Sequence, residues 1–243
     1  MKIFLIIIIA FILIRLGEFI SFFARLAYFR KNATEKQRER ALKLYRFSIK
    51  AGGCSVLTKI NYAYIALRHG YIEESEKILK KVLFQTRSVS NIVAAKSSLA
   101  LVYWKRDDID KAIELLEEVI SSGANTNAYG SLGHMYNVTG DYEKAISLNT
   151  MALDYAPNDS IILDNYGTTL FKTGDIKGAK KIYKKLMDNN PTFPEAYVTY
   201  GDILASEGDK NGAKKMYKKA LEANFTFMTT LTKEAIEQRI KGL

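Results

Sequence analysis

Acid–base chemistry requires a histidine or carboxylate beside a second polar group, and this chain offers few such pairs. It contains two histidines, His69 and His134, and one cysteine, Cys54. Asp164 stands later in the chain than His134 and could approach it as a partner for proton transfer. No nucleophile stands in a recognisable motif, and no glycine-rich phosphate loop occurs. So few Cys and His residues also exclude a disulfide framework and a Cys/His zinc site. We therefore expect no catalytic residues, no metal and no cofactor.

A repeat with a period of about 34 residues defines the elements that would position these side chains. Its most regular members are four alanines at nearly equal intervals, Ala112, Ala145, Ala179 and Ala213. Each of the last three is preceded at a constant spacing by a Gly-Asp pair and, further upstream, by another glycine. A fixed period of this length is typical of a solenoid built from helix pairs.

This pattern resembles the tetratricopeptide repeat (TPR), which sets a small residue in the first helix of each pair against an alanine in the second. The resemblance covers about residues 56–227, or about five units. It implies an all-α solenoid, a right-handed superhelix of antiparallel helix pairs. Residues 228–243 are expected to form a C-terminal capping helix that keeps the last open face soluble, with Thr232 as its N-cap.

The resemblance also implies a groove, because in TPR proteins the first helices line a surface that holds an extended peptide or a partner helix. The sixth position of each unit carries a small polar side chain, which can donate to and accept from a peptide backbone. An asparagine ladder does this in some TPR superhelices, although small polar residues equally suit a solvated wall. Aromatic residues and His134 would add anchors, but aromatic residues in helices are more often core, and a groove histidine is usually a surface polar residue. The candidate groove residues are Asn61, Tyr64, Ser98, Trp104, Ser131, His134, Asn165, Phe171 and Thr199.

Residues 1–29 are expected to form a membrane anchor. Residues 3–14 are an uninterrupted apolar run, and apolar side chains continue to Phe29. The interruptions Arg15, Glu18, Ser21 and Arg25 fall on one helical stripe. Two arrangements fit: a single transmembrane helix over residues 3–24, which we favour, or a shorter insertion that continues as an interfacial amphipathic helix.

Positive charge follows the apolar segment. Residues 1–55 contain 11 Lys and Arg against 3 Asp and Glu, whereas the remainder is nearly neutral. Such a bias predicts that the repeat lies on the cytoplasmic side of a single-pass protein, and the cluster would attract anionic lipid headgroups. A solvated helix face without a partner is the alternative. The residues concerned are Arg25, Arg30, Lys31, Lys36, Arg38, Arg40, Lys43 and Arg46.

Residues 30–55 are expected to form a basic juxtamembrane helix that serves as half of a repeat. Thr34 and Gln37 predict a capping box at its start, and Gly52-Gly53 predicts its end near Ala51. Ala41 and Tyr45 lie one repeat period before Ser75 and Leu79, as in the second helix of a repeat unit.

These features favour a non-enzymatic, membrane-tethered adaptor that binds a protein or peptide partner. The alternatives are a structural subunit of a membrane or envelope complex and a peptide-sensing regulator. Nucleic-acid binding is not expected, because no fold that reads nucleic acid is visible.

Overall fold

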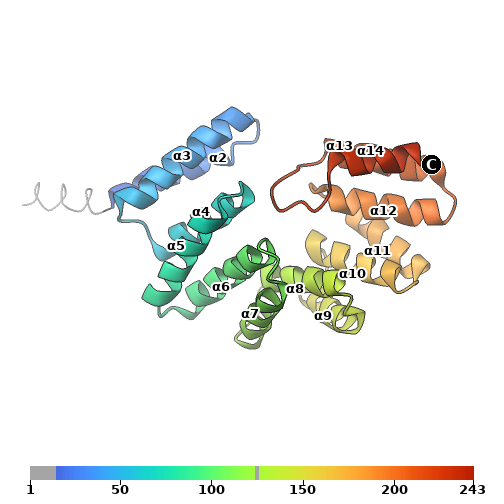
Figure 1. The fold of residues 1–243 in the computed structure, drawn as a ribbon, viewed down its shortest axis with the longest axis horizontal. Helices are drawn as coiled ribbons and strands as arrows, with labels where there is room; N and C mark the ends of the chain where they lie inside the picture. The colour runs from blue at the N-terminus through green and yellow to red at the C-terminus, as the bar shows by residue number, and fades with distance from the viewer. Residues whose placement is uncertain (1–14, 124–125) are drawn as a thin grey trace, which may run out of the picture. The chain divides into compact units, whose positions relative to one another are not determined.

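The computed structural model describes residues 15–123 and 126–243, and all regular elements in these ranges are helices. Figure 1 shows consecutive helices arranged as antiparallel pairs within each of two compact units. The chain divides into two compact units, one ending at Val102 and the other comprising Tyr103–Leu243. The expected all-α helical repeat is confirmed.

The first unit contains α2 (Leu16–Tyr28), α3 (Glu35–Ala51), α4 (Val56–Arg68), α5 (Ile72–Gln85) and most of α6 (Val89–Trp104). Helix α6 has 16 residues, whereas α4 has 13. The interval between the first two repeats is longer than the others in the sequence, and the added residues lengthen the start of α6.

The second unit begins with one helix, continues with three helix pairs and ends with a final helix. The helices are α7 (Ile109–Ser121), α8 (Thr126–Thr139), α9 (Tyr142–Tyr155), α10 (Ser160–Lys172), α11 (Ile176–Asp188), α12 (Pro194–Ser206), α13 (Lys210–Glu222) and α14 (Lys233–Lys241). Thr232 caps α14 by accepting from the Ala235 N–H, as expected, and Ile236 of this helix is completely buried.

The Gly-Asp pairs form the turns inside the helix pairs. Gly140, Gly174 and Gly208 have φ values of 79°, 90° and 85°, a region in which glycine avoids the steric cost of a side chain. The following aspartate caps the second helix; the Asp175 carboxylate, for example, accepts from the Gly178 N–H at 2.9 Å. In the α6–α7 turn the corresponding residue is Asp107, with φ 61°.

Close contact within each pair depends on the small residues. The four repeat alanines are completely buried. A Cβ atom on Gly167 would lie 2.7 Å from the Tyr183 ring, and one on Gly201 would lie 2.4 Å from the Tyr217 ring. Any side chain at these two glycines would therefore displace the tyrosine of the second helix.

The N-terminal segment departs from the expected spanning helix. Helix α3 begins with the Thr34–Gln37 capping box and ends at Gly52, as predicted. Helix α2, however, packs against it as the first helix of the pair, through Ala24 and Tyr28. Within the described ranges, no helix has both the length and the apolar character needed to cross a bilayer. The run over residues 3–14 lies outside the described residues.

Two polar residues of α2, Glu18 and Ser21, turn toward the protein. Ser21 is buried, and the Glu18 carboxylate accepts from the Ser55 N–H at 2.7 Å and from the Thr58 hydroxyl at 2.7 Å. Burial raises the pKa of Glu18, but these hydrogen bonds outweigh it, so the pKa lies below its usual value. Glu18 thus supports the N-terminus of α4, where a carboxylate is favourable.

Candidate binding surface on the first helices

Two of the expected groove residues, Trp104 and His134, contact each other in the second unit. Their ring centroids are 4.9 Å apart in an edge-on arrangement, and the Lys105 ammonium lies 5.0 Å from the centre of the Trp104 ring. Burial, assisted by the nearby Lys105 charge, lowers the pKa of His134 to about 4. His134 is therefore neutral at physiological pH. Its Nε2 atom is buried and has no hydrogen-bond partner among the described residues.

A segment of the same chain reaches this cluster. The connection between α13 and α14 loops out from the two helices (Figure 1), and the Phe227 ring centre lies 4.8 Å from the Lys105 ammonium. After Phe227, the Thr230 backbone N–H donates to the Glu195 carboxylate at 2.8 Å, and before it the Asn224 N–H donates to the Thr192 carbonyl. Glu195 lies in the first turn of α12. Glu195 of α12, together with residues that border α6 and α12, therefore already holds a non-helical stretch of polypeptide.

Phe227 was not among the expected groove residues. It stands at the end of the last repeat, where the repeat register assigns no groove position. The sequence shows two phenylalanines in Asn224–Met228, but it does not indicate which part of the protein this segment contacts.

The expected sixth-position row is only partly available to a ligand. Asn165 is buried, and its side-chain amide donates to the Gly130 carbonyl at 2.7 Å, joining α10 to α8. Next to it, the Asn137 amide donates to the Asn165 carbonyl, and the Thr169 hydroxyl donates to Asn137 Oδ1. Asn165 thus fastens neighbouring repeats together.

The other expected positions divide between the two units. In the first unit Ser98 is buried and donates to the Ala94 carbonyl, whereas Asn61 is partly exposed and Tyr64 is exposed. In the second unit Ser131, Phe171 and Thr199 are partly exposed, and Phe171 packs against the apolar core.

No hydrogen bond joins His134 to Asp164 in the described structure, so the possible proton-transfer pair is not formed. The Asp164 carboxylate instead accepts from the Tyr183 hydroxyl at 2.8 Å. Burial raises the pKa of Asp164 to about 7, the Tyr183 hydrogen bond opposes the rise, and the Glu195 charge adds to it. Within residues 15–123 and 126–243, no group of His, Cys, Asp and Glu side chains is arranged to hold a metal ion.

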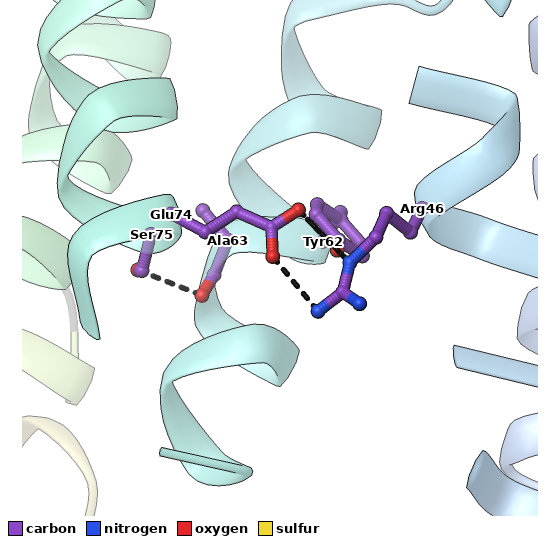
Figure 2. A network of polar contacts seen from close by, with 5 residues as sticks. All are labelled: Arg46, Tyr62, Ala63, Glu74 and Ser75. Atoms are coloured by element: carbon purple, nitrogen blue, oxygen red, sulfur yellow. Dashed lines mark hydrogen bonds and ion pairs between the residues drawn. The ribbon is translucent and has the colours of Figure 1, made fainter. Parts of the chain in front are cut away.

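The basic cluster of the first unit is smaller than expected, because Arg46 has a structural role. Its guanidinium forms an ion pair with Glu74 at 2.8 Å and donates to the Tyr62 hydroxyl (Figure 2). It also stacks over the Tyr71 ring. The same figure shows the Ser75 hydroxyl donating to the Ala63 carbonyl at the small-residue positions of this repeat. Arg38 is partly buried. The exposed members of the cluster are Arg25, Arg30, Lys31, Lys36, Arg40 and Lys43.

Comparisons with known proteins agree with this repeat architecture. Two family models described as tetratricopeptide repeat match residues 98–160 and 170–226. No curated protein sequence matches the chain.

Several solved structures share the fold at low sequence identity. A tetratricopeptide repeat protein from Parabacteroides merdae is 17% identical, with a TM-score of 0.66 over 90% of this chain and 83% of the other. The thermophilic TPR protein TTC0263 from Thermus thermophilus is 16% identical, with a TM-score of 0.62 over 77% and 98%. YrrB, described as a TPR protein with an unusual peptide-binding site, is 18% identical, with a TM-score of 0.50 over 82% and 97%. The helix pairs, the small-residue contacts and these matches together show that the chain carries tetratricopeptide repeats.

Proposed function

We propose that the protein is a non-enzymatic adaptor that binds an extended segment of a partner protein on the first helices of its second unit. The observation that carries this proposal is the connection after α13. Glu195 accepts a backbone N–H from Thr230, and Lys105 lies over the Phe227 ring. The same side chains are suited to a partner segment that presents a backbone donor and an aromatic ring.

Trp104 is the most suitable anchor on this surface. It is partly buried beside His134, so its ring is held in place while part of it stays accessible. Tryptophan is among the residue types enriched at binding hot spots. The peptide-binding site named for YrrB concerns that protein, and it is consistent with a similar use of the fold here.

An array of immobilised peptides, probed with the full chain, tests the proposal. Trp104→Ala and Glu195→Gln should each weaken the signal of the peptides that the unsubstituted protein binds. Tyr155→Ala is the matched control, because Tyr155 is an aromatic residue on α9, a second helix, and is 69% exposed. Equal loss in all three variants, or binding that none of them alters, would rule out this surface. Asn165 is unsuitable as a test position, because its replacement would break the bond to Gly130.

A second part of the proposal is attachment to a membrane through residues 1–29, with the repeat on the cytoplasmic side. The apolar run over residues 3–14 and the exposed basic residues after it support this attachment. The competing role, a structural subunit of a membrane or envelope complex, draws on the same segment. Deletion of residues 1–14 distinguishes the two and leaves α2 in place against α3. An adaptor should keep its peptide binding, whereas an assembly subunit should lose its complex.

Cys54 is a poor label for testing the orientation. It is buried, its thiol donates to the Ser48 carbonyl, and burial raises its pKa. A cysteine introduced at exposed Lys50 in a Cys54→Ala background is a better target for an impermeant maleimide. We expect labelling only after cell lysis. Labelling in intact cells would place the repeat on the outer side.

A further inference from the structure

Helix α2 packs with its small residues and Tyr28 inward and its large aliphatic and phenylalanine side chains mostly outward. Gly17, Ser21 and Ala24 are buried on one side of the helix, against the rest of the first unit. The opposite side of the helix and its C-cap residue together carry five large apolar side chains that are between 48% and 64% exposed, and we call these the outer face of α2. They are Phe19, Phe22, Phe23, Leu26 and Phe29.

Such an arrangement is the reverse of that in a surface helix of a water-soluble domain, where the apolar stripe faces the core. Neighbouring aromatic rings on this face are in contact. The ring centroids of Phe19 and Phe23 lie 5.0 Å apart, and those of Phe22 and Phe23 lie 5.4 Å apart. A contiguous exposed apolar patch of this kind marks a surface that binds a membrane or another protein.

We propose that the outer face of α2 lies on an anionic lipid bilayer, with the helix axis parallel to the membrane plane. This inference rests on the proposed membrane attachment and specifies the surface that makes it. It is independent of the peptide-binding surface of the second unit.

The packing of α2 determines its orientation. A Cβ atom on Gly17 would lie 1.9 Å from the Gly52 carbonyl oxygen, so α2 and the end of α3 are in backbone contact. Glu18 is bonded to Ser55 and Thr58 at the start of α4. A helix surrounded by lipid on every side would need to break these contacts. Lipid can therefore reach α2 only from the outer face.

Charge identifies the occupant as an anionic lipid surface. Arg15, Arg25 and Arg30 are exposed on or next to α2, and Lys36, Arg40 and Lys43 are exposed on α3. Packed helices have axes about 8–10 Å apart, which is about one Debye length in physiological salt. The cations of α3 would thus act on the headgroups while the phenylalanines enter the acyl boundary, as interfacial helices do.

The start of the outer face adds a further feature. A shallow hollow of about 340 Å³ is lined by Arg15, Glu18, Phe19 and Phe22, so a cation and two aromatic rings border one opening. In the sequence, the apolar residues 3–14 directly precede it. The surface of this hollow is mostly apolar, which suits the acyl chain of a lipid.

Depth-dependent fluorescence quenching tests the proposal in the full chain. Trp104→Phe removes the only tryptophan, and Phe19→Trp or Leu26→Trp then places a single one on the outer face. The vesicles contain equal parts of phosphatidylcholine and phosphatidylserine, with bromine either near the glycerol end or near the methyl end of the acyl chains. Phe84→Trp is the control, because Phe84 is an 85% exposed aromatic residue on α5.

An in-plane helix should place both reporters at the same shallow depth, so shallow bromines quench both equally and deep bromines quench neither strongly. The control position should not be quenched. A spanning helix would instead separate the reporters by about 10 Å in depth, since each residue between them adds a rise of about 1.5 Å, and this result would overturn the inference.

Two further outcomes distinguish a failure of this inference from a failure of the proposed membrane attachment. If the protein floats with the vesicles but neither reporter is quenched, the membrane attachment holds and the outer face serves another partner, such as a protein. If the protein does not float with the vesicles at all, both fail. Vesicles of phosphatidylcholine alone should bind less protein, and equal binding would refute the role of the basic residues.

Discussion

The Tyr183 hydroxyl donates a hydrogen bond to the Asp164 carboxylate at 2.8 Å, and the Tyr183 ring passes directly behind Gly167. A residue of a second helix thereby reaches a polar group on the first helix, through the space that the glycine leaves. Tyr217 repeats the arrangement one unit later, where it donates to Asp202 at 2.7 Å behind Gly201. Gly167 and Gly201 thus allow two helices to pack closely, and they also leave space for a buried tyrosine to reach a carboxylate.

The raised pKa of Asp164 predicts a pH-dependent stability. The native carboxyl holds its proton up to about pH 7, whereas its reference value is 3.8. Between these values the native state binds more protons than the unfolded state, so the stability from this group falls as pH rises, by at most about 1.4 kcal/mol per pH unit. Asp164→Asn should remove this fall. Urea unfolding at a series of pH values measures it, and an unchanged profile would contradict the assignment.

His134 should act in the opposite direction. Its native pKa is about 4, below the reference value of 6.5. Between these values the unfolded state binds more protons, so stability is lost as pH falls from 6.5 toward 4. Because Asp164 overlaps this window with the opposite sign, His134→Gln is best compared in the Asp164→Asn background. The substitution should reduce the change of the free energy of unfolding with pH between about pH 4 and pH 6.5. A slope that persists would show that His134 is accessible to protons in the native state.

Replacing Gly201 with alanine should destabilise the last repeat. The new Cβ atom would lie 2.4 Å from the Tyr217 ring, which has no room to retreat because it is almost completely buried. We expect a loss of about 1–3 kcal/mol from overpacking, despite the higher helix propensity of alanine. Thermal unfolding followed by circular dichroism measures the loss. Gly242→Ala is the control, since its Cβ atom would meet its nearest neighbour at 3.6 Å and should cause little change.

Asp107→Gly should stabilise the protein. Asp107 has φ 61°, at the turn position that glycine occupies in the following repeats. Relief of this left-handed conformation is expected to contribute up to about 1 kcal/mol. The next residue provides a contrast, because Asp108 caps α7 and Asp108→Ala should cost about 1 kcal/mol. Urea midpoints that shift in the same direction for both variants would contradict this account of the turn.

The helical repeat and the ends of many helices could be predicted from the sequence because they depend on local chemistry. The predicted Thr34–Gln37 capping box and Thr232 cap each join residues that are close neighbours in the chain. The small residues of the repeat likewise identify which sides of two helices meet. Neither feature requires knowledge of distant parts of the chain.

The candidate surface was less predictable, because its outcome depends on contacts between repeats. Asn165 occupies the position expected to face a ligand, but the Gly130 carbonyl of the preceding repeat takes its amide. Arg46 appears in the sequence as one more basic residue, yet Glu74, on a helix well beyond it in the chain, pairs with it. The repeat register gives the side of a helix on which a residue lies, but it does not give the partners that compete for it.

The sequence by itself determined the helix pairs, their turns, their caps and the two-sided character of residues 16–28. Only the tertiary structure decided which side of that helix is inside. Gly17, Ser21 and Ala24 permit backbone contact with α3, and Glu18 bonds to the start of α4. The phenylalanines are consequently left on the outside. The physical reason is that periodicity in a sequence reports two different faces, whereas the choice between them depends on the shape and hydrogen-bonding groups of a neighbour that is distant in the chain.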